Sequence, residues 1–431
     1  MTDKIIALIK QEVLPALGCT EPIAVALAVA KACEVLREAG YEPADLKAEV
    51  SANILKNGMG VGIPGTGMVG LHIAVALASV CGKSEYKLEV LKDLDADCVA
   101  KAKKMVEDGK VRIERSHTTQ KLYVLASAAG CGHCAEAVVS GSHDTITAIR
   151  LDGREMECIQ HVADEVEEST HELDPDFAKQ ITVRQIVDFA LQAPIEKLEF
   201  IMDSVKLNKA LSDEGLAHKY GLQIGRTILS SGNAVVYGDT ILTYAMARTA
   251  AASDARMAGC TLPAMSNSGS GNQGITVTVP VIAVAEKTGA SREQLIRALT
   301  LAHLVAIHIK GHLGKLSALC GCVIASTGSS CGIVYLRGGG YEQICAAIKN
   351  MIGNITGMVC DGAKEGCAMK VASGVACSMQ SAILALDGIC ISANDGIIEK
   401  DIEKTIANLG RIGSVGMQTT DEMILDIMTC K

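Results

Sequence analysis

Three of the 17 cysteines in this chain stand apart because of the residues around them. Cys360 and Cys367 enclose the run 361–366, whose polar and small residues have no packing role that would explain them. Cys320 precedes Gly321, which would let the backbone fold around an inorganic core. Three thiolates on a four-iron cluster leave one iron open, and an open iron is a Lewis acid for a carboxylate and a leaving heteroatom. The pattern indicates a lyase with a 4Fe-4S cluster rather than an electron carrier, although by spacing alone the thiols could hold zinc or no metal.

Another thiol, Cys19, lies two residues from the carboxylate of Glu21, at a proline break between two helical segments. Unpaired backbone amides at a helix start lower the pKa of a nearby thiol, which would make a thiolate available as a base. Cys19 and Glu21 are therefore candidate catalytic residues. The alternative is a helix-entry turn in which Glu21 complements the helix dipole and Cys19 only packs.

Two glycine-rich loops are candidates for binding a small anionic substrate. The loop 57–60 lacks the Gly-Lys-Ser/Thr ending of a nucleotide loop. The polar run 266–274 precedes an apolar stretch, and its hydroxyls, carboxamides and backbone amides suit the carboxylate of an amino acid. We therefore favour a binding loop over the alternative, a solvent-exposed turn. The candidate substrate-binding residues are Asn57, Ser266, Asn267, Ser268, Gly269, Asn272 and Gln273.

Two further groups of metal-ligating residue types have structural explanations. Cys131 and Cys134 form a Cys-x-x-Cys that could be a redox pair or half of a zinc site, but no second pair stands at zinc-finger distance. His308 and His312 share one helix face in an apolar setting, which predicts satisfied buried histidines. We assign neither group a function.

The elements that must position these residues fall into two groups. Up to about residue 160, helical stretches alternate with β-rich runs. From residue 181 onward, apolar residues recur almost entirely at the helical spacing of 3.6 residues. Strands are expected at 46–50, 86–91, 111–115, 121–126 and 145–151, with helices at about 2–14, 22–38, 70–80 and 96–107. Later helices are expected at 181–192, 194–209, 213–230, 240–258, 291–307, 341–352, 371–386 and 399–408. With the acidic segment 164–175 as a linker, this predicts an α+β fold with an N-terminal α/β domain over 1–163 and a larger, mostly helical domain over 176–431.

Composition and charge limit the classes of molecule that this protein can bind and the compartment in which it works. A net charge of -9 without long like-charge runs argues against nucleic acid. The amino terminus lacks the features of a secretory signal, and an odd number of cysteines suits a reducing compartment. The uncharged stretch 316–336 is too rich in Gly, Ser, Thr and Cys to face lipid, so we expect a buried, close-packed segment there. These features predict a cytoplasmic protein with a small-molecule partner and no membrane span.

Four motifs give the chain a resemblance to a known family. They are Gly-Cys-Thr-Glu-Pro at 18–22, Asn-Gly-Met-Gly at 57–60, the run 263–274 and the run 360–367. Together they resemble the L-cysteine desulfidase group, which is similar to the catalytic subunit of bacterial iron-sulfur L-serine dehydratases. The likeness covers about residues 10 to 425, so the helical domain is expected to resemble the dehydratase catalytic domain.

The resemblance implies conversion of L-cysteine to pyruvate, ammonia and sulfide with an oxygen-sensitive 4Fe-4S cluster and without pyridoxal phosphate. It places Cys320, Cys360 and Cys367 as cluster ligands, Cys19 as the catalytic thiol and the loop 266–273 against the substrate. The cluster cysteines are spaced differently from those of the better-studied dehydratases, so L-serine is the alternative substrate. A non-enzymatic iron-sulfur redox sensor is the alternative from another class. We expect a homodimer that acts on a small amino acid.

Overall fold

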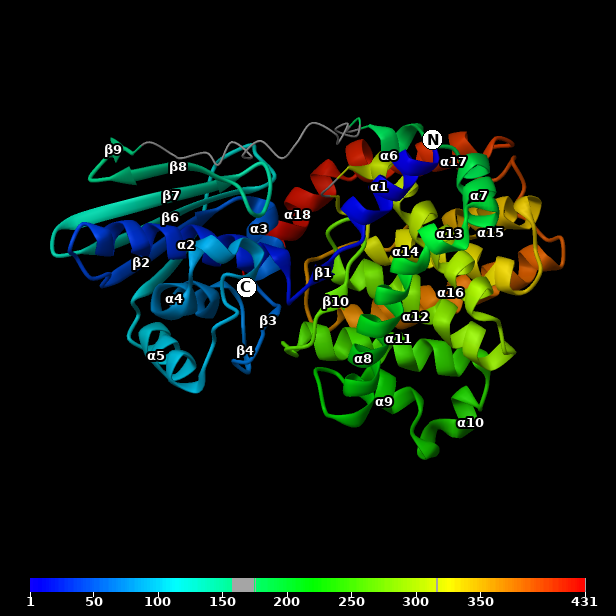
Figure 1. The fold of residues 1–431 in the computed structure, drawn as a ribbon, viewed down its shortest axis with the longest axis horizontal. Helices are drawn as coiled ribbons and strands as arrows, with labels where there is room; N and C mark the ends of the chain where they lie inside the picture. The colour runs from blue at the N-terminus through cyan, green and yellow to red at the C-terminus, as the bar shows by residue number, and fades with distance from the viewer. Residues whose placement is uncertain (157–173, 175, 315–316, 431) are drawn as a thin grey trace.

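A six-stranded mixed sheet forms the core of the first part of the chain (Figure 1). This computed structural model describes residues 1–156, 174, 176–314 and 317–430. The sheet order is β5-β2-β6-β7-β8-β9, with β2 parallel to β5 and the other pairs antiparallel. The strands are β2 (Asp45–Val50), β5 (Val111–Arg115), β6 (Tyr123–Gly130), β7 (His133–Ser140), β8 (Ile146–Leu151) and β9 (Arg154–Glu155). Alternate residues of β6 are buried, because only one face of the sheet meets the core.

Helices cover that face of the sheet. The apolar helix α2 (Thr20–Glu38) lies across β6 and β7, and α4 (Leu71–Cys81) packs on α2. The helix α5 (Ala96–Glu107) then packs on α4. The short elements α3 (Ala52–Gly58), β3 (Gly62–Ile63) and β4 (Met68–Val69) connect β2 to α4. They run along the side of the sheet that faces the helical part of the chain (Figure 1).

The second part of the chain is helical, as expected, apart from the short strand β10 (Ala264–Met265). Capping boxes formed by Thr182 with Gln185 and by Ser291 with Gln294 begin two of its helices. Its helices are α6 (Phe177–Gln180), α7 (Val183–Gln192), α8 (Met202–Ala217), α9 (Ile224–Ile228), α10 (Ala234–Tyr237), α11 (Ile241–Met257), α12 (Gly271–Thr288), α13 (Arg292–Leu313), α14 (Gly321–Leu336), α15 (Tyr341–Ile355), α16 (Cys367–Leu386), α17 (Ile402–Arg411) and α18 (Gln418–Thr429). The α+β fold class is therefore confirmed.

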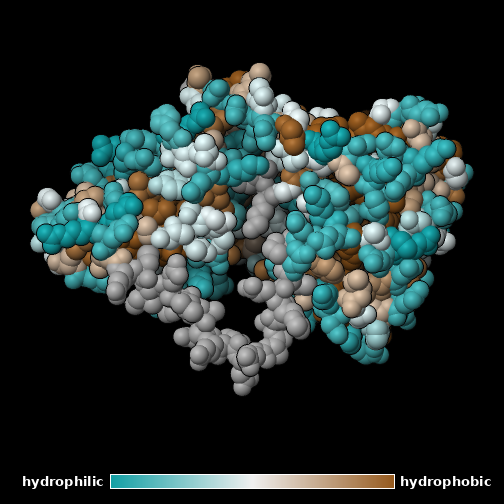
Figure 2. All heavy atoms as spheres, turned by 90° about the horizontal axis from the view of Figure 1, so that it is seen from above, coloured by the Kyte–Doolittle hydropathy of each residue, from teal (hydrophilic) through white to brown (hydrophobic). Residues whose placement is uncertain are grey.

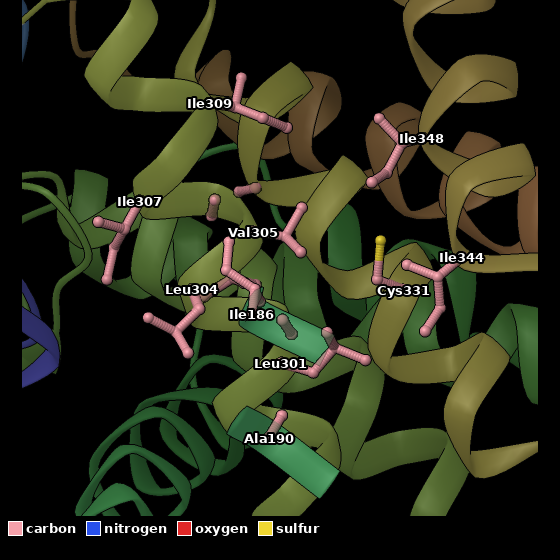
Figure 3. Packing of buried hydrophobic residues seen from close by; sticks show 14 of the residues in the cluster. Ile186, Ala190, Leu301, Leu304, Val305, Ile307, Ile309, Cys331, Ile344 and Ile348 are labelled. Atoms are coloured by element: carbon pink, nitrogen blue, oxygen red, sulfur yellow. The ribbon is translucent and has the colours of Figure 1, made fainter. Parts of the chain in front are cut away.

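The core of the helical part gathers around α13 and α14. Side chains such as Leu301 on α13, Ile186 on α7 and Ile344 on α15 meet there (Figure 3). Gly328 and Gly332 of α14 let this helix approach α13 closely, since a Cβ on Gly328 would lie 2.4 Å from the carbonyl oxygen of Ala302. The buried, close-packed segment expected at 316–336 is confirmed for residues 322–334, all of which are buried.

The two ends of the chain cross between these parts. The first helix, α1 (Thr2–Glu12), contributes to the core of the helical part, and β1 (Pro15–Ala16) pairs with β10. At the other end, α18 packs against α3, which belongs to the sheet side (Figure 1). The division into domains 1–163 and 176–431 stays a prediction, and its linker at 164–175 lies almost wholly outside the described residues.

Two of the expected elements differ in the structure. Residues 86–91 alternate like a strand, yet the segment Ser84–Glu89 is a 3-10 helix in which Lys87 has a φ of 49°. The helix expected at 213–230 is two helices, because α8 ends at Ala217 and α9 begins only at Ile224. The strand β7 and the terminal helix α18 had no counterpart among the predictions.

One described helix, α16, is long and apolar enough to cross a membrane, and half of its apolar window is buried inside the protein. It packs against α11, α14 and α15, as a core helix does. On the face shown in Figure 2, hydrophilic residues cover much of both parts of the chain, with apolar residues between them.

Candidate active site

Cys320 and Cys360 lie side by side because two backbone hydrogen bonds join their segments. The amide of Cys320 donates to the carbonyl of Met358 (3.0 Å), and the amide of Cys360 donates to the carbonyl of Ala318 (2.7 Å). Leu319 and Val359 form an antiparallel bridge between them. Residues forty positions apart in the sequence are thus brought together at the start of α14.

Cys367 closes the same loop as the first residue of α16, and its Sγ lies 3.6 Å from the carbonyl oxygen of Gly362. Gly362 has a φ of +90°, and a Cβ there would lie 2.1 Å from the carbonyl oxygen of Lys56. Only glycine suits both the turn and this approach to α3. The loop therefore joins the cysteines of the helical part to the sheet side.

Thiolates at these three positions would repel one another, because the sulfurs lie close together in a partly buried place. Burial and the neighbouring thiols Cys322 and Cys360 raise the pKa of the Cys320 thiol well above its usual value. Burial also raises the pKa of Cys367, with a further contribution from Cys360. A cationic core bound to all three sulfurs would relieve this repulsion, because thiolates are the metal-binding form.

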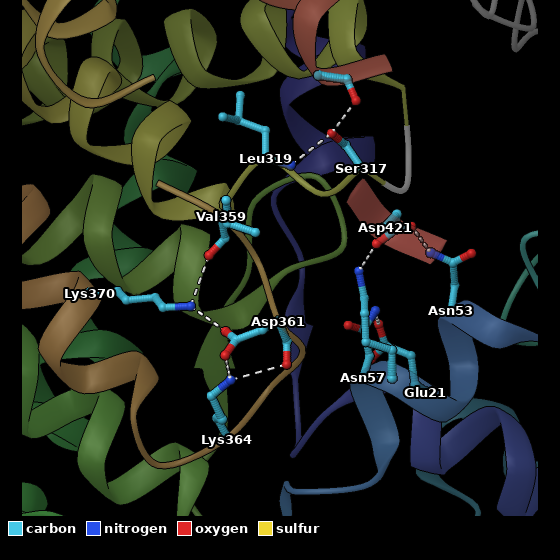
Figure 4. Close-up of polar contacts among 12 residues, drawn as sticks. Glu21, Asn53, Asn57, Ser317, Leu319, Val359, Asp361, Lys364, Lys370 and Asp421 are labelled. Atoms are coloured by element: carbon cyan, nitrogen blue, oxygen red, sulfur yellow. Dashed lines mark hydrogen bonds and ion pairs between the residues drawn. The ribbon is translucent and has the colours of Figure 1, made fainter. Parts of the chain in front are cut away.

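Two lysines place positive charge beside these thiols. Lys370 on α16 donates to the carbonyl of Val359 (2.9 Å) and pairs with Asp361, which also pairs with Lys364 (Figure 4). Lys370 interacts favourably with Cys320 and Cys367. Burial lowers the pKa of Lys310, at the end of α13, to about 8, while Cys360 and Cys320 act in the opposite direction.

The donor chemistry of the three cysteines fits an iron-sulfur cluster, because Cys thiolates are the usual ligands of its irons. The described residues contain no group of three or more His, Cys, Asp or Glu side chains arranged to hold one metal ion. In a four-iron cluster each thiolate binds a different iron, so the ligands stand farther apart than around zinc. The thiols of Cys320, Cys360 and Cys367 are half-buried and come from converging segments. Their roles as ligands stay a prediction.

Cys19 lies at the same place. It is the N-cap residue of α2, as the proline break predicted, and it packs in a small cluster with Val61, Met257 and Cys367. Its Sγ donates to Oε2 of Glu21 (2.9 Å), and Nδ2 of Asn57 donates to Oε1 of Glu21 (3.0 Å). Three candidate residues from α2 and α3 are thus joined by hydrogen bonds.

The pKa of the Cys19 thiol moves opposite to the expectation from its helix-start position. Burial raises this pKa, the carboxylate of Glu21 raises it further, and the guanidinium of Arg256 opposes them. The helix start contributes less than the loss of water around a thiol that is only 8% exposed. Cys19 is therefore a thiol in this state, hydrogen-bonded to the carboxylate that could take its proton.

The polar loop 266–274 makes many of its bonds inside the protein. Ser266 Oγ donates to the carbonyl of Leu14 (2.7 Å), which fixes β1. Asn267 is fully buried, donates to Nδ1 or the carbonyl of His303 (3.0 and 3.3 Å) and accepts from Gln273 Nε2 (2.7 Å). These contacts hold the loop together, and contact of Ser266, Asn267, Ser268 and Gly269 with substrate stays a prediction.

Gln273 and Asn272 connect this loop to the thiols. A Cβ on Gly321 would lie 3.2 Å from Oε1 of Gln273, which places that amide beside the turn of Cys320. Asn272 Oδ1 accepts a hydrogen bond from Nη1 of Arg256 (3.3 Å), and Nη2 of Arg256 donates to the carbonyl of Gly18 (2.8 Å). Arg256 was not among the predicted site residues, although a charged residue near the end of an alanine-rich helix was a signal.

Two cavities adjoin these segments. One, of about 350 Å³, lies between α3, α18 and residues 317–318, next to the segment that binds the Cys360 amide. Lys56 and Arg115 line it, and Asp421 of α18 pairs there with Lys56 and accepts from Asn53 (3.0 Å; Figure 4). The other, of about 570 Å³, is lined by Leu17, Pro64 and residues of α5.

The other metal-ligating residue types lie away from this site. Cys131 and Gly132 form the positive-φ turn between β6 and β7, a conventional hairpin. His308 is 1% exposed and makes hydrogen bonds to the carbonyl of Ala178 (3.0 Å) and to Glu403 (2.9 Å). The prediction of a satisfied buried histidine is confirmed for His308. It is wrong for His312, which is only partly buried and whose Nε2 has no hydrogen-bond partner among the described residues.

Comparison with known proteins identifies the family. A family model described as the serine dehydratase alpha chain matches residues 85–426. The chain belongs to the serine dehydratase alpha chain family. The chain is also similar over its whole length to UPF0597 proteins of Bacteroides fragilis (48% identical, 99% of this chain, 98% of the relative), Phocaeicola vulgatus (49%, 100% and 98%) and Oleidesulfovibrio alaskensis (48%, 100% and 98%). The expected relation to the iron-sulfur serine dehydratase alpha subunit is confirmed, and membership in the serine dehydratase alpha chain family supports a lyase.

A buried carboxyl behind the site gives a prediction of pH-dependent stability. Asp254 on α11 is 1% exposed, and its Oδ2 accepts from the amide of Gly225 (3.0 Å). Burial is the largest effect on this carboxyl and raises its pKa to about 6 from 3.8. The protonated carboxyl therefore contributes to the stability of the folded protein at low pH, and this contribution is lost as the pH rises through about 6. The substitution Asp254→Asn should therefore stabilise the protein by on the order of 2 kcal/mol at pH 8 and by less at pH 4.5, measured by Tm. An equal change at both pH values would contradict this.

Proposed function

We propose that this protein is an iron-sulfur-dependent lyase that converts L-cysteine to pyruvate, ammonia and sulfide. The observation that carries the proposal is the convergence of Cys19, Cys320, Cys360 and Cys367 from separate segments of the chain. Membership in the serine dehydratase alpha chain family supports elimination from a small amino acid. Cysteine as the preferred substrate follows from the resemblance of the four motifs.

Cys320, Cys360 and Cys367 would hold a 4Fe-4S cluster, with Lys310 and Lys370 balancing its negative charge. When bound by only three thiolates, such a cluster supplies a Lewis acid for the leaving group of the substrate. Gly362 keeps the ligand loop against α3, so the ligands and the Cys19 turn stay in one place. The rest of the chemistry falls to the residues of this chain.

The pair of Cys19 and Glu21 would move the α-proton. Glu21 accepts the Cys19 proton along their hydrogen bond, and the thiolate then removes the α-proton of the substrate. The electron pair of the Cα–H bond forms the Cα–Cβ double bond while the Cβ–S bond breaks and sulfide leaves with a proton. The resulting aminoacrylate tautomerises and reacts with one water to give pyruvate and ammonia. Asn57 orients Glu21 for this transfer.

L-Serine is the second candidate substrate, and the family description favours it. The elimination is the same except that water leaves in place of sulfide. Anaerobic reconstitution with iron and sulfide, followed by assays of pyruvate from cysteine, serine and threonine, decides between them. We expect iron in the protein and the highest kcat/KM with cysteine. A preference for serine would make it a dehydratase, bound iron without any pyruvate would favour a redox sensor, and absence of iron would refute the proposal.

A further inference from the structure

Arg256 occupies an unusual position at the end of α11. It is only 6% exposed, and a Cβ on Gly271 would lie 2.2 Å from its Nε, so the guanidinium packs directly against the first residue of α12. Its Nη2 donates to the carbonyl of Gly18 and its Nη1 to Oδ1 of Asn272. The guanidinium therefore stands between the turn that carries Cys19 and the start of an 18-residue helix.

This buried cation has no anionic partner in the part of the chain that the structure describes. No described carboxylate lies within ion-pair distance of Arg256, and its Nε makes no hydrogen bond there. Arginine remains protonated in proteins and offers five N–H donors, of which the two contacts above use two. A buried charge without a counter-ion is unfavourable. The arrangement is therefore suited to an anion that arrives from outside.

We propose that Arg256 binds the α-carboxylate of the amino-acid substrate, an inference that rests on the proposed lyase function. A guanidinium fork matches a carboxylate, and the positive end of the α12 dipole at Gly271 adds to the attraction. Because Gly18 directly precedes Cys19, a carboxylate held by Arg256 places the neighbouring α-carbon beside the Cys19 thiol. Asn272, which already contacts Arg256, orients the fork.

Ligand binding tests this assignment without requiring turnover. L-Alanine resembles the substrate but has no leaving group, and L-alaninamide lacks the carboxylate charge. In anaerobic calorimetry on the reconstituted protein, we expect wild-type protein to bind L-alanine at least about 30-fold more tightly than L-alaninamide. The variant Arg256→Gln should lose most of this preference, and Arg256→Lys should lose about 10-fold of it, because lysine lacks the planar fork.

A purely structural role for Arg256 predicts a different result. If Arg256 only joined Gly18 to Asn272, Arg256→Gln would weaken the binding of L-alanine and L-alaninamide equally, and the ratio of their affinities would not change. Arg248→Gln is the matched control, since Arg248 lies on the same helix and pairs with Asp213 on α8 (2.6 Å). The ratio should be unchanged in this control, and thermal melting checks that each variant is folded.

Two results would overturn the inference: wild-type protein that does not prefer L-alanine, or an Arg256→Gln variant that keeps the wild-type preference. The outcome is separate from that of the proposed function. A protein that prefers L-alanine through Arg256 but makes no pyruvate would refute the lyase and support the carboxylate site. A protein that makes pyruvate while Arg256→Gln keeps the preference for L-alanine would support the lyase and refute the carboxylate site.

Discussion

The variant Cys360→Ala should lose its iron and its pyruvate-forming activity together. Cys360 lies beside Cys320 through the backbone bonds of the segments 318–320 and 358–360, so alanine at this position removes one of the three converging sulfurs. A cluster left with two thiolates is expected to dissociate, and the rate should fall at least about 1000-fold, because metal ligands cannot be replaced by alanine. Iron content and visible absorbance after anaerobic reconstitution measure the first loss, and pyruvate formation measures the second.

Cys322→Ala is the matched control for this variant. Cys322 lies two residues from Cys320 and is buried, but its Sγ contacts the carbonyl of Lys370 (3.1 Å) and Ser326, inside the seam of α14 and α16. Its loss should reduce stability by about 1 kcal/mol and leave the iron content unchanged. If Cys322→Ala lost the iron and Cys360→Ala kept it, the ligand assignment would be wrong.

The sequence was sufficient for the fold class and for locating the polar loop between Cys360 and Cys367. Helical periodicity over the second half of the chain and mixed periods before it predict the α+β fold directly. The cysteines at 360 and 367 stand out because the residues between them are polar, and the structure shows why: Asp361 and Lys364 form an ion-pair network with Lys370. Local composition can reveal such a loop.

Contacts between distant segments could not be predicted in the same way. Asn267 belongs to a polar run that suits a substrate, but its partner His303 lies on α13 and is not visible from the run itself. Burial lowers the pKa of His303 to about 3, so this imidazole is neutral and serves the loop as a hydrogen-bonding group. Arg256 was missed for a related reason, because its importance depends on Gly18 and Asn272 meeting it in space.

The segment 86–91 shows the limit of period-two patterns. Tyr86, Leu88 and Val90 alternate with charged residues, as in a half-buried strand. Lys87 has a positive φ, and the segment folds as a 3-10 turn between α4 and α5 without pairing to the sheet. The strand β5 ends the sheet beside β2, and the positive φ at Lys87 interrupts the extended backbone that pairing with such an edge would require.

The variant Cys19→Ala should retain the iron of the wild-type protein but lose activity by about 100- to 10,000-fold, the usual range for a general base. Cys19 contacts Cys367 through the small cluster that also contains Val61 and Met257, yet its own hydrogen bond goes to Glu21. Removing its sulfur therefore leaves the three ligand thiols in place. Visible absorbance and iron content should match those of the wild type, whereas pyruvate formation should not.

A control in the same helix separates chemistry from packing. Cys33 lies on α2, fully buried and away from the loop 360–367, so Cys33→Ala removes a similar amount of sulfur from the core without touching Glu21. Its activity should remain near the wild-type value. Because the Cys19 thiol donates its hydrogen bond to Glu21, a proton relay between them also predicts that Glu21→Gln lowers kcat, since a neutral amide cannot accept that proton. A full rate in Cys19→Ala would remove the thiol from the reaction and leave another residue near the Arg256 fork as the base.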